Sequence, residues 1–245
     1  MPSTPWEAGL LRVVLFTQQA LPITTDIFTG FTGQEATRQE DRPKEGVRVQ
    51  VGEIDDAELR ITISPLLVDL AVSNKPATPE QLMGGPPITF GELKTELAKF
   101  ERRIQAWLPK WEKPTTRISL LITARAPATD RTAAYNILRD NLKSVKIDPQ
   151  RMSDFLYRVN FKANTQTTSD GFYNRISTWS AIQVKAFAST GSGNLALSDQ
   201  HYAQLEMDIN TSGDRTEPLP RDKMAIIYRE FFQLAVEIAN SGEPS

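Results

Sequence analysis

The stretch 203–240, AQLEMDINTSGDRTEPLPRDKMAIIYREFFQLAVEIAN, contains the signals of a strand, a polar loop and an amphipathic helix. Leu205, Met207 and Ile209 alternate with polar residues, and this period of two predicts a strand with one buried face. Beyond Pro220, apolar residues recur at three- and four-residue spacing, which predicts a helix with one buried face. The stretch therefore predicts a strand followed by a helix that packs against a sheet.

The same order recurs earlier in the chain, with a strand at 66–72, a Pro/Gly-rich loop at 73–87 and a helix at 89–108. The spacing of apolar residues predicts burial of Leu97, Phe100 and Ile104 in this helix, and of Ile227, Phe231 and Leu234 in the later one. A second likeness joins RVVLFTQQALP at 12–22 to RISLLITARAP at 117–127. Each segment begins at an arginine, continues through apolar residues and reaches a proline. The chain therefore reads as one unit written twice.

With the other alternating or apolar segments, each half is predicted to contain the same elements in the same order: a strand, a helix, a three-strand meander and a second helix. The remaining expected strands are 10–17, 47–51, 59–63, 117–125, 155–162 and 176–187. We expect an α+β fold with a duplicated unit, a mostly antiparallel sheet, helices packed on one face and a pseudo-twofold axis. Residues 1–112 and 113–245 are the two expected halves, intimately packed.

Helix starts and loops are also predicted from local chemistry. Thr89 to Glu92 match a capping box, Thr129 is the expected cap of a helix at 130–142, and Thr24 or Thr25 is the expected cap of a short helix before Phe31. Polar composition predicts loops, which are 33–46, 73–87 and 189–194.

Composition narrows the classes of function. The 245 residues are 40% hydrophobic with a formal charge of -2, and they contain neither a basic run nor about 18 consecutive apolar residues. We therefore expect neither nucleic-acid binding nor a membrane span. The N-terminus lacks the pattern of a signal peptide, and the chain has no cysteine, so a cytoplasmic location is expected.

The sequence lacks most of the residue types and motifs that common enzyme active sites require. Without cysteine there is no thiol nucleophile, and His201 is the only histidine. Gly84 and Gly85 precede prolines instead of the Gly-Lys of a phosphate-binding loop. We therefore expect a protein that is not an enzyme, with no metal and no cofactor.

Seven residues are the candidate ligand-binding residues. Asp69 and Asp208 occupy corresponding strands of the two halves and could face each other across the pseudo-twofold axis, where paired carboxylates can perform acid–base chemistry or bind a metal ion. Arg12 and Arg117 begin corresponding strands and are expected to bind carboxylates. Aromatic side chains are expected to line a cleft between the halves, and these are Tyr157, Phe161 and Trp179.

The segment LEMDINTSGDRTEPLPRDKMAIIYREFFQLAVEIANS resembles the C-terminal part of a sporadically distributed, largely uncharacterised family of bacterial proteins of about this length. The likeness lies in a strand ending near Asp208, then Thr211, then a helix with Tyr228 and the pair Phe231-Phe232. It implies a bacterial protein with an accessory role, such as a mobile defence or stress system. It brings no site residue with it.

Two functions are compatible with these observations. One is a non-catalytic protein-interaction subunit or regulator that binds a protein partner or a second copy of itself through its long loops, a sheet edge and exposed aromatic residues such as Trp111. The other is a small-molecule sensor that uses a cleft between the halves. An enzyme of an unrecognised type ranks third.

Overall fold

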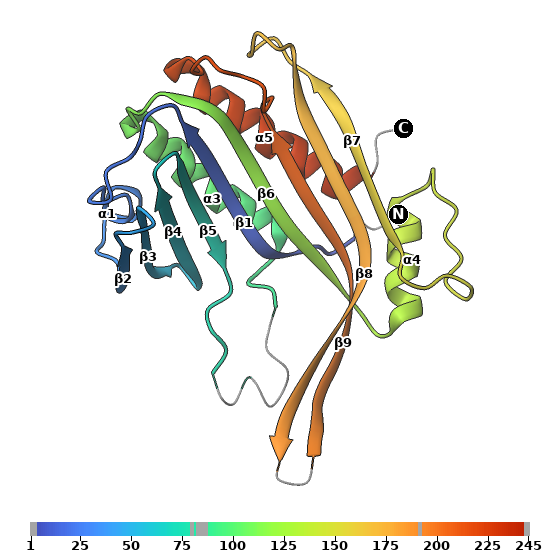
Figure 1. Cartoon of the computed structure of the whole chain (residues 1–245). Helices are drawn as coiled ribbons and strands as arrows, with labels where there is room; N and C mark the ends of the chain where they lie inside the picture. Colours follow the sequence, from blue (N-terminus) through green and yellow to red (C-terminus); the bar gives the residue numbers. More distant parts are fainter. Residues whose placement is uncertain (1–3, 79–80, 82–87, 191–192, 243–245) are drawn as a thin grey trace.

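Two long antiparallel strands, β1 and β6, lie at the centre of one sheet. The computed structural model describes residues 4–78, 81, 88–190 and 193–242, and these residues form nine strands in the order β2-β3-β4-β5-β1-β6-β9-β8-β7 (Figure 1). The strands are β1 Glu7–Thr17, β2 Arg38–Arg42, β3 Val47–Ile54, β4 Ala57–Ser64, β5 Leu67–Ser73, β6 Thr115–Ala128, β7 Leu156–Asn164, β8 Phe172–Thr190 and β9 Gly193–Asn210.

Every neighbouring pair of strands in this sheet is antiparallel. The expected central position of the first strand is confirmed, because β1 lies between β5 and β6. The meander β3-β4-β5 continues the sheet on one side of this centre, and β9-β8-β7 continues it on the other. The α+β class and the antiparallel sheet are therefore as predicted.

The helices α3 (Leu93–Trp107) and α5 (Arg221–Ser241) lie behind the sheet in the view of Figure 1 and bury their apolar stripes against it. The short helix α1 (Phe28–Thr32) and the helix α4 (Arg131–Asn141) add side chains to the same core. Burial is confirmed for Leu97, Phe100, Ile104, Ile227 and Phe231, whereas Leu234 is half-buried. The side-chain spacing of both long helices thus correctly identified their core faces.

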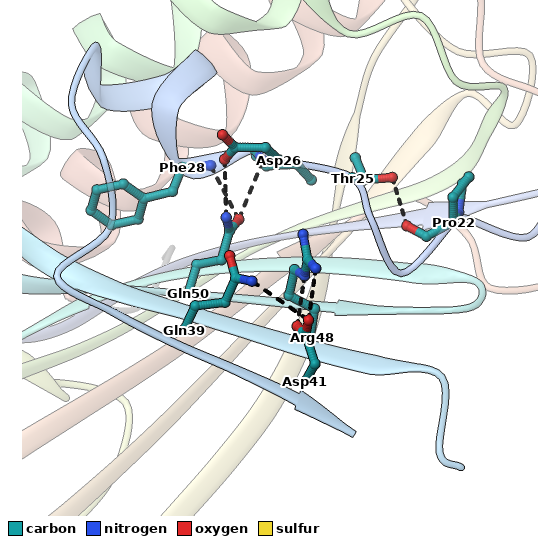
Figure 2. A network of polar contacts seen from close by, with 9 residues as sticks. Pro22, Thr25, Asp26, Phe28, Gln39, Asp41, Arg48 and Gln50 are labelled. Carbon is teal, nitrogen blue, oxygen red and sulfur yellow. Dashed lines mark hydrogen bonds and ion pairs between the residues drawn. The ribbon is translucent and has the colours of Figure 1, made fainter. Parts of the chain in front are cut away.

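Gln50 fastens α1 to the sheet (Figure 2). Its side chain is 2% exposed, and its carbonyl accepts hydrogen bonds from the backbone N–H groups of Ile27 and Phe28, each at 3.3 Å. Its amide donates to Asp26 at 2.9 Å, so a buried polar side chain is satisfied on both sides. Gly52 leaves room for the ring of Phe28, whose Cζ would lie 2.5 Å from an added Cβ.

Three expected helix boundaries are wrong. Thr89 does not cap α3, because its hydroxyl donates to Glu7 at 2.6 Å and the helix begins only at Leu93. In α4 the cap is Asp130, whose carboxylate accepts from the backbone N–H of Ala133 at 2.8 Å, in place of Thr129. The short helix begins later than predicted, after Ile27. Long-range contacts of the chain before α3 override the local capping signal.

The predicted loop 33–46 is also partly wrong, since it contains the edge strand β2, which pairs with β3. The loop 73–87 lies partly outside the described residues. The hairpin at 189–194 is narrower than predicted, because β8 continues to Thr190 and β9 starts at Gly193, and Gly191 and Ser192 lie outside the described residues. Of the loops offered as docking elements, the first is therefore partly a strand.

Among the helices that the structure describes, none combines the length and the apolar composition that a membrane crossing requires.

Candidate functional site

The face of the sheet opposite the helices is covered by no described helix, and we call it the open face. It is the near face of the sheet in Figure 1. Six residues on this face are paired in succession across six neighbouring strands, from β5 to β7. They are Ala71, Arg12, Leu121, Asp208, Ile176 and Asn160. Charged, amide and apolar side chains thus meet on a surface that no described element hides.

Arg12 and Asp69 form a two-pronged ion pair on the open face. The Nε and Nη2 atoms of Arg12 donate to the two carboxylate oxygens of Asp69 at 2.8 and 2.7 Å. The hydrogen bond to Asp69 raises the pKa of Arg12, against the opposing effect of burial. The prediction that Arg12 binds a carboxylate is confirmed.

A chain of side-chain amides crosses three strands on the other side of the open face. Asn160 donates to Asn174 at 3.1 Å, Asn174 donates to Asn210 at 3.1 Å, and Asn210 donates to the carboxylate of Asp208 at 2.8 Å. Asn210 is buried. This series of hydrogen bonds orients the side chain of Asp208, because each amide donates to the next side chain and the last one donates to the carboxylate.

A groove of about 300 Å³ lies beside Asp208 on the open face. Its apolar lining includes Leu10, Leu121 and Ile176, and Glu206 and Arg158 also border it. Glu206 accepts a hydrogen bond from Gln204 at 3.0 Å. The groove offers an apolar floor with charged groups of both signs at its border, which suits a side chain or a small polar molecule.

Asp69 and Asp208 lie on the open face but do not meet. Their strands, β5 and β9, are separated by β1 and β6, and Asp69 pairs with Val14 whereas Asp208 pairs with Leu121. Three strand spacings amount to about 14 Å, too far for two carboxylates to share a proton or a metal ion. These two carboxylates therefore cannot perform joint acid–base chemistry.

The three candidate aromatic residues belong to the opposite side of the sheet. Trp179 is fully buried, lies 5.9 Å from Trp6 between ring centroids and donates to Ser177 at 3.2 Å. Tyr157 pairs with Trp179 in register, and Phe161 lies farther along β7. They are therefore not neighbours of Arg12, Asp69 or Asp208, and the seven candidates do not converge on one cleft.

Two further expectations concern Arg117 and Trp111. The guanidinium of Arg117 lies 5.1 Å from the centroid of the Phe16 ring, and within the described residues its Nε atom is buried without a hydrogen-bond partner. The structure therefore does not pair Arg117 with a carboxylate as it pairs Arg12. Trp111 was expected to be exposed, which is wrong: it packs beside Trp107 and donates to Thr115 at 2.9 Å.

The two edges of the sheet differ in length and in charge. The outer strand β2 has five residues, RQEDR, all exposed, and such short, charged edges resist pairing with other strands. The outer strand β7 has nine residues, LYRVNFKAN, and carries no carboxylate. Two of its apolar side chains are exposed, Leu156 at 67% and Phe161 at 39%. β7 also carries two cations, Arg158 and Lys162, but it is longer than β2 and a smaller share of its residues is charged, so of the two edges it is the better suited to accept an additional strand.

The sequence did not reveal the amide chain, the groove or the edge position of β7. Each depends on which strands become neighbours, and the only available signal was the polar phase of each alternating strand. Within the described part of the chain no three His, Cys, Asp or Glu side chains gather as a metal site would require. No protein-family model matches this chain, and no curated protein sequence matches it either.

Proposed function

We propose that this chain is a non-catalytic protein-interaction subunit that binds by adding a strand to the β7 edge. The observation that carries the proposal is the nine-residue outer strand with exposed Leu156 and Phe161, opposite an edge that is short and charged. An edge strand offers a row of backbone donors and acceptors to another strand. The partner we propose is a second copy of this chain.

The sequence of β7 suits antiparallel pairing with itself. In the register that places Val159 opposite Val159 of the second copy, Tyr157 faces Phe161 twice. Directly opposed residues lie on the same face, and aromatic pairs of this kind contribute roughly 0.2 to 1 kcal/mol each. On the open face Arg158 opposes Asn160 and Leu156 opposes Lys162, so no two like charges are directly opposed.

The absence of cysteine from the chain allows a sharp test. A single Val159→Cys substitution creates one thiol per chain, which the proposed register places opposite its own copy, within the roughly 4.5 to 5.5 Å between Cβ atoms of facing residues. We expect a disulfide-linked dimer under mild oxidation. A matched Thr132→Cys variant on α4 should form no disulfide-linked dimer under the same oxidation.

A second measurement tests the surface without a cross-link. Phe161→Glu places a carboxylate on the edge, and sedimentation equilibrium should show a loss of dimer. Ile226→Glu, which changes an exposed apolar residue of α5, should leave association unchanged. A monomer at all concentrations, together with failure of the Val159→Cys cross-link, would contradict the homotypic proposal.

A small-molecule sensor is the second candidate, and the groove beside Asp208 is the observation that favours it. Its volume of about 300 Å³ lies at the lower end of the range typical of ligand pockets. A thermal-shift screen of metabolites against the wild type and an Ile176→Trp variant, which fills the groove, would separate specific binding from general stabilisation. A ligand that raises the melting temperature of the wild type alone would favour the sensor.

We also propose that the two halves are repeats related by a pseudo-twofold axis. The strand order supports this, since β5-β4-β3 follows outward from β1 as β9-β8-β7 follows from β6. Arg12 and Arg117 are 105 positions apart, and with this offset Val14 corresponds to Ser119. These two residues also pair with each other in the sheet, so the proposed axis would pass between them. Asp69 and Asn210, which pair with these two residues, would then correspond, in place of Asp69 and Asp208. Superposing 7–107 on 115–241 in an experimental structure tests the repeat.

A further inference from the structure

A second hollow, remote from β7 and from the open face, lies against the outer side of α3 where α1 approaches it. Its volume is about 500 Å³. Phe31 of α1 and Trp107 of α3 contribute aromatic rings that meet edge to face with centroids 5.9 Å apart. Its charged lining consists of one carboxylate, that of Asp55, and four cations, which are Lys99, Arg102, Arg103 and Lys110.

Nearby carboxylates account for only two of these cations. Arg103 donates to Asp55 at 2.9 Å, and Lys99 donates to Glu96 at 2.8 Å. Asp55 and Asp56 add weaker attraction at Lys99. Arg102 and Lys110 are exposed and have no ion-pair or hydrogen-bond partner within the described residues. The hollow thus holds two cations that no carboxylate of the described chain neutralises.

We infer that this hollow binds a phosphate-bearing small molecule. A guanidinium presents parallel N–H donors that match phosphate oxygens, and a lysine adds a point charge. The aromatic side of the hollow suits an attached apolar or ring group, and the volume falls within the range of small-molecule sites. This inference is independent of the proposed pairing through β7.

The concave shape of the hollow distinguishes it from a group of solvated cations on a flat surface. Solvated cations on an exposed helix commonly have no partner, but here two unpaired cations, from α3 and from the 3₁₀ turn η1 (Leu108–Lys110), border one concave space backed by aromatic rings. A concave site with convergent polar groups is the usual setting for a ligand, whereas a flat charged face is not.

Calorimetric titration with inorganic tripolyphosphate and with AMP tests the inference on the full-length chain. We expect one molecule bound per chain by at least one of the two probes, with affinity that falls as salt is added, because ions screen exposed charges. The double variant Arg102→Ala/Lys110→Ala should bind at least tenfold more weakly. Arg102→Gln alone should weaken binding to a smaller degree.

The matched control is Arg139→Ala/Lys143→Ala, which removes one exposed arginine and one exposed lysine at and just beyond the end of α4. It should bind like the wild type, and melting curves should show both double variants folded. Quenching of tryptophan fluorescence by the probe, lost in Trp107→Phe, would support this location. Failure of both probes to bind at millimolar concentration, or equal weakening in the two double variants, would overturn the inference.

Discussion

The two faces of the sheet are built from the same strands but differ in what stabilises them. On the covered face, Phe231 of α5 packs against Tyr173 of β8 with ring centroids 4.9 Å apart, and Phe231, Tyr228 and the strand residue Leu15 are fully buried. On the open face, Arg12 pairs with Asp69 and amide side chains bond one another across the strands. One face is held by exclusion of water, and the other by directed polar contacts.

This difference separates residues that make the fold from residues available for recognition. Burial of apolar area is worth roughly 25 cal/mol per Å², so large covered rings dominate stability. Exposed or half-exposed ion pairs contribute about 0 to 1 kcal/mol. Substitutions on the covered face should therefore unfold the protein, whereas substitutions on the open face and at the β7 edge should mainly change what it binds.

The largest expected effect is at Phe231. Truncation of this fully buried ring to Ala should cost about 3 to 5 kcal/mol of unfolding free energy, because it removes apolar contacts and leaves a cavity. Urea denaturation measures the loss. Ile226→Ala, on the exposed side of the same helix, should cost less than about 0.5 kcal/mol. Equal losses would show that the covered and exposed sides of α5 are wrongly assigned.

Tyr173 should give the next largest effect, through Glu230 of α5. Its hydroxyl donates to Glu230 at 2.5 Å, and Thr165 and Thr167 donate to the same carboxylate at 3.0 and 2.7 Å. Tyr173→Phe removes a hydrogen bond to a charged group, and we expect a cost of about 2 kcal/mol at pH 7. The loss should appear in urea denaturation at neutral pH.

The same substitution should change the pH dependence of stability. Burial, and then the hydrogen bond to Glu230, raises the pKa of Tyr173 above its usual 10.0. A raised pKa favours the neutral phenol in the folded state, so this stability is complete below about pH 10 and is lost as pH rises beyond it. Above pH 10, the unfolding free energy of Tyr173→Phe should therefore fall less steeply with pH than that of the wild type. Tyr135→Phe, which also loses a buried hydroxyl, is the control; identical alkaline slopes for wild type and Tyr173→Phe would contradict the assignment.

The covered face was largely predictable from the sequence, and the open face was not. Side-chain spacing identifies the buried stripe of a helix without knowledge of its neighbours, which is why Phe100, Ile104 and Phe231 were placed correctly. Contacts between strands depend on strand order and register. Arg12 and Asp69 are 57 positions apart and meet only because β1 pairs with β5. Asp208 does lie on an alternating strand as predicted, but its neighbour is Asn210 and it does not face Asp69.

Local signals also failed where distant contacts competed with them. The capping box at Thr89 was convincing in isolation, yet Glu7 of β1 takes the Thr89 hydroxyl. Trp111 was expected to be exposed, but its ring packs beside Trp107 and its indole N–H donates to Thr115. The hollow bordered by Arg102 and Lys110 has no sequence signal, since its aromatic side combines α1 with α3.

On the open face, the Arg12–Asp69 pair should have a smaller effect than either buried ring. The side chains are 37% and 15% exposed, so solvent screens part of the attraction. We expect a coupling of about 1 kcal/mol from a double-mutant cycle of Arg12→Met, Asp69→Asn and the double variant. A coupling near zero would show that this face owes its order to apolar contacts, as the covered face does.

The smallest expected effect on the isolated chain is at Phe161, the counterpart of Phe231 on the free edge. At low protein concentration, Phe161→Ala should change the unfolding free energy by less than about 0.5 kcal/mol, because the ring is already 39% exposed. If β7 pairs with a second copy, the wild type should melt at a higher temperature as its concentration rises, since association stabilises only the folded state. The variant should lose this dependence while keeping its stability when dilute. A loss above about 1 kcal/mol in the dilute chain would instead make Phe161 part of the core, and the contrast between the two phenylalanines would disappear.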